Sequence, residues 1–205
     1  MSDDPVRSEY DQLAASYDQR WAGYLHRSID ATLESVTLRE GERVLDVGCG
    51  TGLLLEALRS QSPGAQFDGI DLSADMLFQA SRRLGEHAVL AQADAGVLPF
   101  ADECFDRIIS SSMFHYLPEP GRALAEWHRV LRPGGELVIG DWSRDYWSMV
   151  GLDLFLRLFN AAHRRTWKPA ELQALLQRSG FHDIRIQQRR LDAFWGYMVL
   201  RATRD

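Results

Sequence analysis

Short apolar runs alternate with longer amphipathic runs through the middle of this chain. The strand-length apolar runs are RVLDVG, QFDGIDL, AVLAQAD, FDRIISSS and GELVIGDW. The runs with helical spacing of apolar positions are TGLLLEALRSQ, SADMLFQASRRLG and PGRALAEWHRVL. Strands separated by helix-length crossovers predict a mostly parallel sheet with helices on both faces. The consecutive apolar positions within the strands agree with this, because both faces of such a sheet are covered.

Helical patterns precede this alternation. Residues 8–21 place four side chains at the spacing of one helix face. They are Tyr10, Leu13, Tyr17 and Trp21. A second helix is predicted over residues 24–36. We therefore expect a helical extension ahead of a single sheet domain.

The C-terminal third contains an aromatic insertion, residues 142–168, ahead of a helix predicted over residues 169–178. Its large aromatic residues are Trp142, Tyr146, Trp147, Phe155, Phe159 and Trp167. Apolar residues surround the run MVGLDLFLRLF almost fully, so we expect a buried helix or a lid, with an interfacial helix at a membrane as the alternative. Two final strand-like runs, joined by a short turn around Asp192, predict an antiparallel hairpin and a reversed last strand.

Composition narrows the class of protein. The 205 residues are 45% hydrophobic and 25% charged, as is typical of one globular domain. The net charge of −6 argues against a nucleic-acid-binding protein, which normally has a basic excess. The chain has only two cysteines, no apolar leader and no apolar run of about 18 residues. These features predict a cytoplasmic protein without a membrane span.

Three glycines in five positions follow the first predicted strand: Gly48, Gly50 and Gly52. Such a turn lets the backbone approach a ligand, and the next helix N-terminus favours an anionic group. A tight connection without a ligand is the alternative, although one glycine would suffice for it. Leu53 stands where a dinucleotide-binding fingerprint has its third glycine or alanine, which disfavours a nicotinamide oxidoreductase.

Carboxylates follow the next two strands at the same predicted edge of the sheet. Asp71 ends the second strand, where it can accept both hydroxyls of a ribose, and an N-cap for the following helix is the alternative. Asp94 ends the third strand, where it can accept a hydrogen bond from an exocyclic amine of a purine. With the glycine turn, these residues predict a nucleoside that carries a carboxylate.

Four segments resemble the motif series of class I S-adenosylmethionine-dependent methyltransferases. They are VLDVGCGTG, GIDLS, QADAGVLPFADECFD and RVLRPGGELVIGD, in that order within residues 43–141. The chain is most similar to the small-molecule branch with the ubiquinone and menaquinone biosynthesis methyltransferases, whose lid motif the opening YDQLAASYD also resembles. The resemblance implies a Rossmann-like, doubly wound α/β fold with a seven-stranded, mostly parallel sheet whose last strand is antiparallel.

The same resemblance implies S-adenosyl-L-methionine as cofactor and a role for each matching residue. Residues 1–38 would form a lid, and residues 142–168 would cover the acceptor site. Gly48, Gly50 and Gly52 would hold the methionine end, with Asp46 and the Ser111 carbonyl near its ammonium. Asp71 would bind the ribose, whereas Leu72, Asp94 and the backbone N–H of Ala95 would contact the adenine. Tyr10 and Tyr17 would close over the cofactor.

Methyl transfer from an activated cofactor needs alignment more than a catalytic signature. His115 and Tyr116 follow the fourth strand and are the candidate catalytic residues. His115 is interpreted as a general base or, alternatively, as a residue that fixes the loop.

The aromatic insertion favours a small apolar or aromatic acceptor, and O-, N- and C-methylation stay open. The cluster His163, Arg164 and Arg165 is either a site for an acidic group or a solvated basic cluster. We predict no metal site, leave peripheral membrane contact and the oligomeric state open, and keep a non-catalytic cofactor-binding module or partner subunit as the alternative function.

Overall fold

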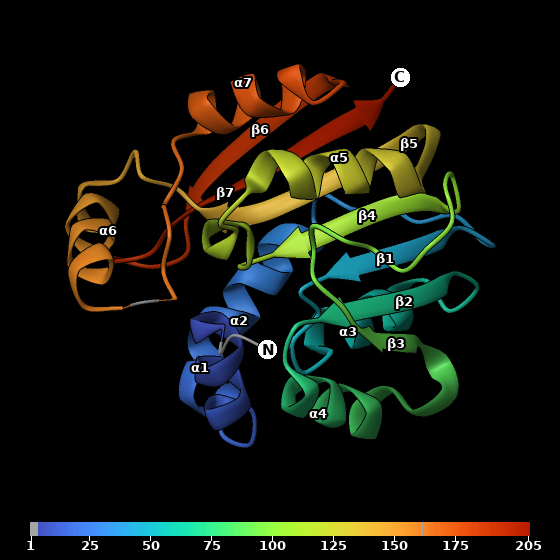
Figure 1. The fold of residues 1–205 in the computed structure, drawn as a ribbon, viewed down its shortest axis with the longest axis horizontal. Coiled ribbons are helices and arrows are strands. Elements are labelled where there is room, and N and C mark those ends of the chain that lie inside the picture. Colours follow the sequence, from blue (N-terminus) through green and yellow to red (C-terminus); the bar gives the residue numbers. More distant parts are fainter. Residues whose placement is uncertain (1–3, 161) are drawn as a thin grey trace.

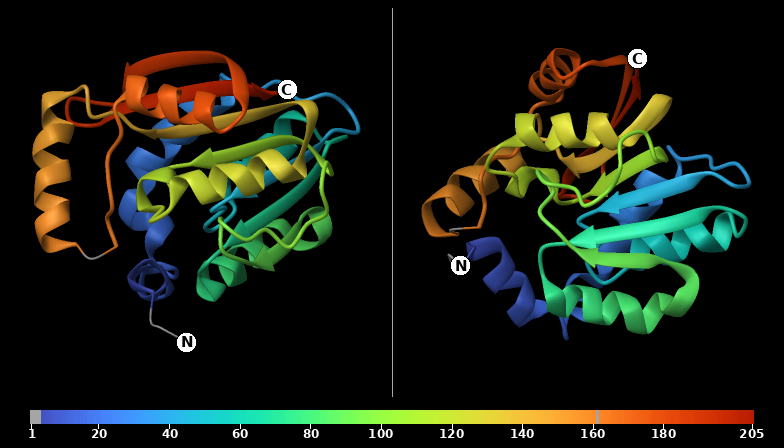
Figure 2. Two further views of the ribbon diagram at one scale, coloured as in Figure 1. Left: turned by 45° about the horizontal axis from the view of Figure 1, so that its top comes forward. Right: turned by 45° about the vertical axis from the view of Figure 1, so that its right-hand side comes forward.

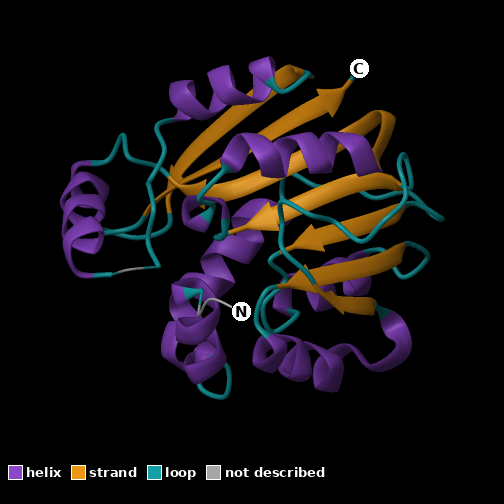
Figure 3. Cartoon of the chain, viewed as in Figure 1, coloured by secondary structure: helices purple, strands orange, loops and turns teal. Residues whose placement is uncertain are grey.

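The computed structural model describes residues 4–160 and 162–205. Its sheet has seven strands in the order β3-β2-β1-β4-β5-β7-β6 (Figures 1 and 3). The strands are β1 (Arg43–Val47), β2 (Gln66–Asp71), β3 (Val89–Gln92), β4 (Phe105–Ser111), β5 (Leu131–Trp142), β6 (Phe181–Arg190) and β7 (Gly196–Arg204). The α-helices are α1 (Pro5–Leu13), α2 (Tyr17–Leu33), α3 (Leu53–Gln61), α4 (Ala74–Leu84), α5 (Pro120–Val130), α6 (Trp147–Phe159) and α7 (Pro169–Arg178), with short 3-10 turns η1 (Gly85–His87) and η2 (Phe114–Tyr116).

The pairing of the strands confirms the predicted sheet. Strands β1 to β5 are parallel, whereas β7 pairs antiparallel with β5 on one side and β6 on the other. The predicted turn between β6 and β7 forms because an Asp192 carboxylate oxygen accepts from the N–H groups of Phe194 and Trp195, both at 2.8 Å. The strand order reverses between β1 and β4, which is where such sheets bind ligands.

Neighbouring residues of one strand point into different cores. Val44 packs in the core under α2, α3 and α4, whereas Leu45 packs in the core under α5 and α7. Ile109 and Ile108 divide in the same way, and all four side chains are fully buried. Helices therefore cover both faces of the sheet (Figure 2), which explains the consecutive apolar positions of the strands.

The N-terminal extension is helical, but the predicted helix boundaries are wrong. The chain breaks between α1 and α2 at residues 14–16, not between residues 21 and 24. Ser16 is the N-cap of α2, and its N–H bonds to the Leu13 carbonyl at 2.9 Å. This turn contains no glycine or proline, so the sequence carries no strong signal for it. As a result Tyr10 and Tyr17 come from different helices, with their rings 5.7 Å apart.

Helix α6 of the aromatic insertion stands at one side of the molecule, apart from the helices on the sheet faces (Figure 2). On its inner side, Asp153 accepts from the Thr166 N–H at 2.7 Å and contacts His163 Nε2 at 2.9 Å. The side chains on the outer side of α6 are exposed. The expectation of a buried helix is therefore wrong for this side of α6. Among the described helices, none is long and apolar enough to cross a membrane.

Candidate functional site

The glycine turn joins β1 to α3 at the edge where the strands β1, β2 and β4 end (Figure 1). Both Gly48 and Cys49 donate from their N–H groups to the Ile70 carbonyl at 2.9 Å, which holds the turn against the end of β2. Gly48 has a φ of 78°, and a Cβ there would lie 2.5 Å from the Met113 side chain. Gly50 has a φ of 54° and open space beside it. These two glycines line a cavity.

Gly52, the third glycine of the turn, has a different environment. Its φ is 81°, and a Cβ there would lie 3.0 Å from Leu84 and 3.2 Å from Ala80. It permits close packing of the start of α3 on α4, and it does not line the described cavities. The structure therefore shows a packing role for Gly52, and its contact with the cofactor stays a prediction.

Asp71 lies at the end of β2 and faces the glycine turn. Its carboxylate accepts from the N–H of Gly50 at 2.8 Å and from the N–H of Ser73 at 2.9 Å. Burial raises the pKa of Asp71, and these backbone hydrogen bonds oppose that rise. Asp71 is not the N-cap of the following helix, which was the alternative role for it. Ser73 is the N-cap of α4, and its hydroxyl accepts from the Met76 N–H.

Asp94 and Ala95 follow β3 and line the same cavity as Asp71. Asp94 accepts from the Gly96 N–H at 2.7 Å, which fixes its loop. Leu72 adds an apolar wall, and its carbonyl accepts from the Gln92 side chain at 2.9 Å. The structure thus brings together the three strand ends that the sequence predicted.

Helices α1 and α2, which the sequence analysis predicted as a lid, border this cavity and are tied to the sheet domain. Tyr10 and Tyr17 both line it, and the Tyr10 hydroxyl donates to the Tyr116 hydroxyl at 2.9 Å. Asp18 accepts from the Thr51 hydroxyl at 2.7 Å and forms an ion pair with Arg83 at 2.6 Å. These contacts hold the start of α2 against the start of α3 and the end of α4.

The cavity beneath α1 and α2 borders a hollow under the glycine turn. The cavity, with its open mouth, encloses about 850 Å³, which is within the size range of ligand sites. The two share Tyr17, Gly48, Gly50, Ser111 and Ser112. The hollow also contains Asp46 of β1, which is 1% exposed.

A second cavity, about 700 Å³ with its mouth, lies on the other side of the Tyr10–Tyr116 pair. Its aromatic walls are Trp21, Tyr24, Trp142 and Trp195, besides Tyr10, Tyr17 and Tyr116. Trp142 Nε1 donates to the Tyr24 hydroxyl at 2.8 Å, and that hydroxyl bonds to the Ser112 hydroxyl at 2.6 Å. Ser112 has a φ of 58° and lines all three cavities, so it stands where they meet.

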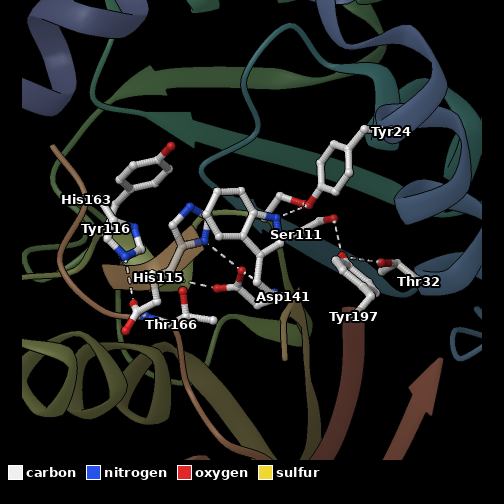
Figure 4. Close-up of polar contacts among 12 residues, drawn as sticks. Tyr24, Thr32, Ser111, His115, Tyr116, Asp141, His163, Thr166 and Tyr197 are labelled. Carbon is white, nitrogen blue, oxygen red and sulfur yellow. Dashed lines mark hydrogen bonds and ion pairs between the residues drawn. The ribbon is translucent and has the colours of Figure 1, made fainter. Parts of the chain in front are cut away.

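His115 lines the second cavity, and its ring is held by a hydrogen bond to Asp141 (Figure 4) and by stacking on Trp142. Its Nδ1 donates to the Asp141 carboxylate at 2.7 Å, and its backbone N–H donates to the other carboxylate oxygen at 2.8 Å. The ring stacks on Trp142 with centroids 4.0 Å apart. In the neutral ring this hydrogen bond leaves the lone pair on Nε2, and Nε2 has no hydrogen-bond partner among the described residues.

Comparison with known proteins agrees with this geometry. A sequence model of the methyltransferase domain matches residues 45–139. The chain is 36% identical over 164 residues to a phosphatidylethanolamine N-methyltransferase of Cereibacter sphaeroides, covering 74% of this chain and 78% of that protein. The chain belongs to the S-adenosylmethionine-dependent methyltransferases. This methyltransferase is also 36% identical over 162 residues to a demethylmenaquinone methyltransferase of Clavibacter sepedonicus, covering 75% of this chain and 62% of that protein.

Among solved structures, a SAM-dependent methyltransferase of Thermotoga maritima has a TM-score of 0.81 at 19% identity, covering 98% of this chain and 100% of that chain. At this identity the likeness shows the fold alone. The matched part of the chain spans 56% of the length of a related 27-O-demethylrifamycin SV methyltransferase of Amycolatopsis mediterranei. It spans between half and two thirds of the length of several curated relatives.

The cofactor of the methyltransferases is S-adenosylmethionine, and the residues of the first cavity fit it. Asp46 Oδ1 has no hydrogen-bond partner among the described residues. Burial, and then the nearby Asp71, raise the pKa of Asp46 to about 8. A nearby cation would stabilise the ionised form of this buried carboxyl group, and the ammonium of the cofactor would supply that cation. Asp71 and Asp94 would hold the ribose and the adenine.

The sequence-based predictions missed one residue that contacts His115, which is Asp141. Asp141 ends the run VIGDW at the carboxyl end of β5, the same signal that identified Asp71 and Asp94. His163 lines the second cavity, and no local motif marks it. Burial lowers the pKa of His163, so it stays neutral near pH 7. Of the three residues predicted to bind an acidic group, the neutral His163 lines the second cavity, whereas Arg164 and Arg165 do not line it.

Proposed function

We propose that this methyltransferase transfers a methyl group from S-adenosylmethionine to a small molecule bound in the second cavity. One observation carries the proposal: the two cavities meet at Tyr10, Tyr17, Ser112 and Tyr116. The bound cofactor would supply a methyl group activated by its sulfonium. The chain's own residues align the acceptor and exclude water, which supplies about 7–11 kcal/mol in well-oriented reactions.

The acceptor carries an apolar or aromatic group that packs in the second cavity. Four aromatic walls and the inner residues Leu152 and Leu156 of α6 surround the second cavity. Flat or acyl groups pack well against such walls. Two of the relatives are named for acceptors of this kind, a quinone for one and a phospholipid for the other.

His115 serves as the general base for acceptors that lose a proton. Asp141 holds the proton on Nδ1, so Nε2 is the atom that takes the proton from the nucleophile. Tyr116 lies beside it, with ring centroids 4.1 Å apart, and closes the boundary between the cavities through its hydroxyl. An acceptor that is already a nucleophile would not need this step.

A non-catalytic cofactor-binding module is disfavoured, because such a module would need the first cavity alone. We place the enzyme in the cytoplasm, where its two cysteines, which are free in the structure, would stay reduced.

The test is transfer of a labelled methyl group to a panel of a hydroquinone, a phenol, an amine and a phospholipid. We expect labelled product with at least one apolar member of the panel. Cofactor binding without product on any member would contradict the proposal.

A further inference from the structure

The outer side of α6 is an apolar face without a partner among the described residues. We call it the α6 outer face. Its members are Trp147, Val150, Leu154, Phe155, Leu158 and Phe159, each more than half exposed. Spacings of three and four residues place them in one row along the helix. Phe194, 45% exposed, extends the row at the helix start, since the Ser148 hydroxyl donates to its carbonyl. Monomers rarely expose a contiguous apolar patch of this kind without a binding role.

The charge of this segment is opposite in sign to that of the whole chain. Residues 147–168 contain four cations and one acid, a net charge of +3, whereas the chain carries −6. The cations are Arg157, Arg164, Arg165 and Lys168. The acid is Asp153, which is 5% exposed and paired with Arg157 and His163. Arg157 pairs with Asp153 at 2.9 Å and Arg165 pairs with Glu171 at 2.8 Å. Arg164 and Lys168 are exposed and form no ion pair among the described residues, so they are the cations of this segment that are free to contact an anionic surface.

The opposite side of the same helix belongs to the acceptor cavity. Leu152 and Leu156 line that cavity, together with Asn160 just after the helix. Helix α6 stands at one side of the molecule (Figure 1). It thus carries lining residues of the acceptor cavity on one side and exposed apolar residues on the other.

We propose that the α6 outer face docks on an anionic lipid surface. The aromatic residues Trp147, Phe155 and Phe159 insert at the boundary between head groups and acyl chains, where such side chains are favoured. The cations after the helix contact the anionic head groups. A second copy of the chain fits less well, because pairing these faces would bring two segments of +3 together. This contact goes beyond the proposed methyl transfer and does not depend on it.

The experiment is flotation of the full chain with vesicles, without cofactor or acceptor. One set contains phosphatidylcholine alone, and the other contains phosphatidylcholine with phosphatidylglycerol. We expect binding to the anionic vesicles that weakens with added salt, and weaker binding to the neutral ones. The double variant Phe155→Ser, Phe159→Ser should lower the partition coefficient at least about tenfold.

The matched control is Phe78→Ser on α4, a phenylalanine that is 59% exposed, close to the 56% of Phe155. It should bind vesicles as the wild type does. Circular dichroism and cofactor affinity of the double variant check its fold.

Absence of the wild type from the floated fraction would overturn the proposal, as would equal flotation of the double variant. A dimer in sedimentation velocity that the double variant loses, with no vesicle binding, would assign the face to a second copy. Vesicle binding without methyl transfer would count against the proposed function alone.

Discussion

Two carboxyl groups of the cofactor site differ in what they contact. Asp71 accepts from the N–H groups of Gly50 and Ser73, so its oxygens are fixed in direction. Asp46 is buried deeper, and its Oδ1 has no partner among the described residues. Asp71 is therefore suited to bind hydroxyls, whereas Asp46 is suited to meet a cation.

Replacing Asp71 with alanine should weaken binding of S-adenosylmethionine about 30- to 1000-fold. The change removes both acceptors for the ribose hydroxyls, which costs about 2–4 kcal/mol. Isothermal calorimetry measures the dissociation constant. Asp75→Ala, an exposed carboxylate on α4, is the charge-matched control and should bind normally. An unchanged affinity in Asp71→Ala would remove the ribose role.

Asp46 should make the cofactor-free protein less stable as the pH rises. Its pKa is about 8 in the folded chain and near the ordinary 3.8 when unfolded. The folded state then binds more protons between these values, so the free energy of unfolding falls as the pH rises from about 4 to about 8. The melting temperature of wild type relative to Asp46→Asn, measured from pH 5 to 8, should decline. Parallel curves for the two proteins would show that this pKa is not raised.

His115→Ala should lower turnover by about 10²- to 10⁴-fold on acceptors that lose a proton. Cofactor affinity should change little, because the ring lines the second cavity and not the first. Steady-state kinetics and calorimetry give the two quantities. His87→Ala, an exposed histidine after α4, is the control. Equal turnover in His115→Ala and wild type would exclude the base and leave a role in fixing the loop.

At the scale of elements, polar contacts hold the lid to the sheet domain. Asp18 of α2 bonds to Thr51 and Arg83, and Asp11 of α1 accepts from the Ser73 hydroxyl at 2.6 Å. Thr51 and Ser73 lie just before α3 and α4, whereas Arg83 lies in the last turn of α4. The lid therefore closes from the edge that also carries the glycine turn.

Asp18→Ala should speed cofactor dissociation about three- to tenfold. The ion pair with Arg83 is partly exposed, so its loss costs about 1 kcal/mol, and the hydrogen bond from Thr51 adds to this. Stopped-flow fluorescence measures the dissociation rate. Asp30→Ala on the same helix, paired only with the exposed His26, should leave the rate unchanged. An unaltered rate in Asp18→Ala would mean that this contact does not hold the lid closed.

The sequence predicted the strands and crossovers well, because both faces of a parallel sheet impose apolar runs that few other structures need. It did not predict the break at residues 14–16, since α1 ends at Leu13 and α2 begins after Ser16 without a glycine or proline between them. It also could not say which side of α6 faces outward. Apolar residues cover nearly all of that helix, and the buried Asp153 marks its inner side only once its partners are known.

At the scale of the whole molecule, the two cavities differ in how far apart their residues lie in the sequence. The residues predicted to hold the cofactor follow three consecutive strands, so their spacing could predict that they line one cavity. The acceptor cavity is built from distant segments: Tyr24 comes from α2, Trp142 from β5, His163 from the loop after α6 and Trp195 from the last turn. No local pattern links these residues, and only the fold brings them together.

We propose that the cofactor and acceptor sites meet beside Ser112 and Tyr116. A crystal structure with S-adenosylhomocysteine tests it most directly. The ribose hydroxyls should lie within hydrogen-bonding distance of Asp71, with the sulfur directed at the boundary between the cavities. A ligand bound elsewhere, or with its sulfur turned away from the His115 cavity, would contradict the account.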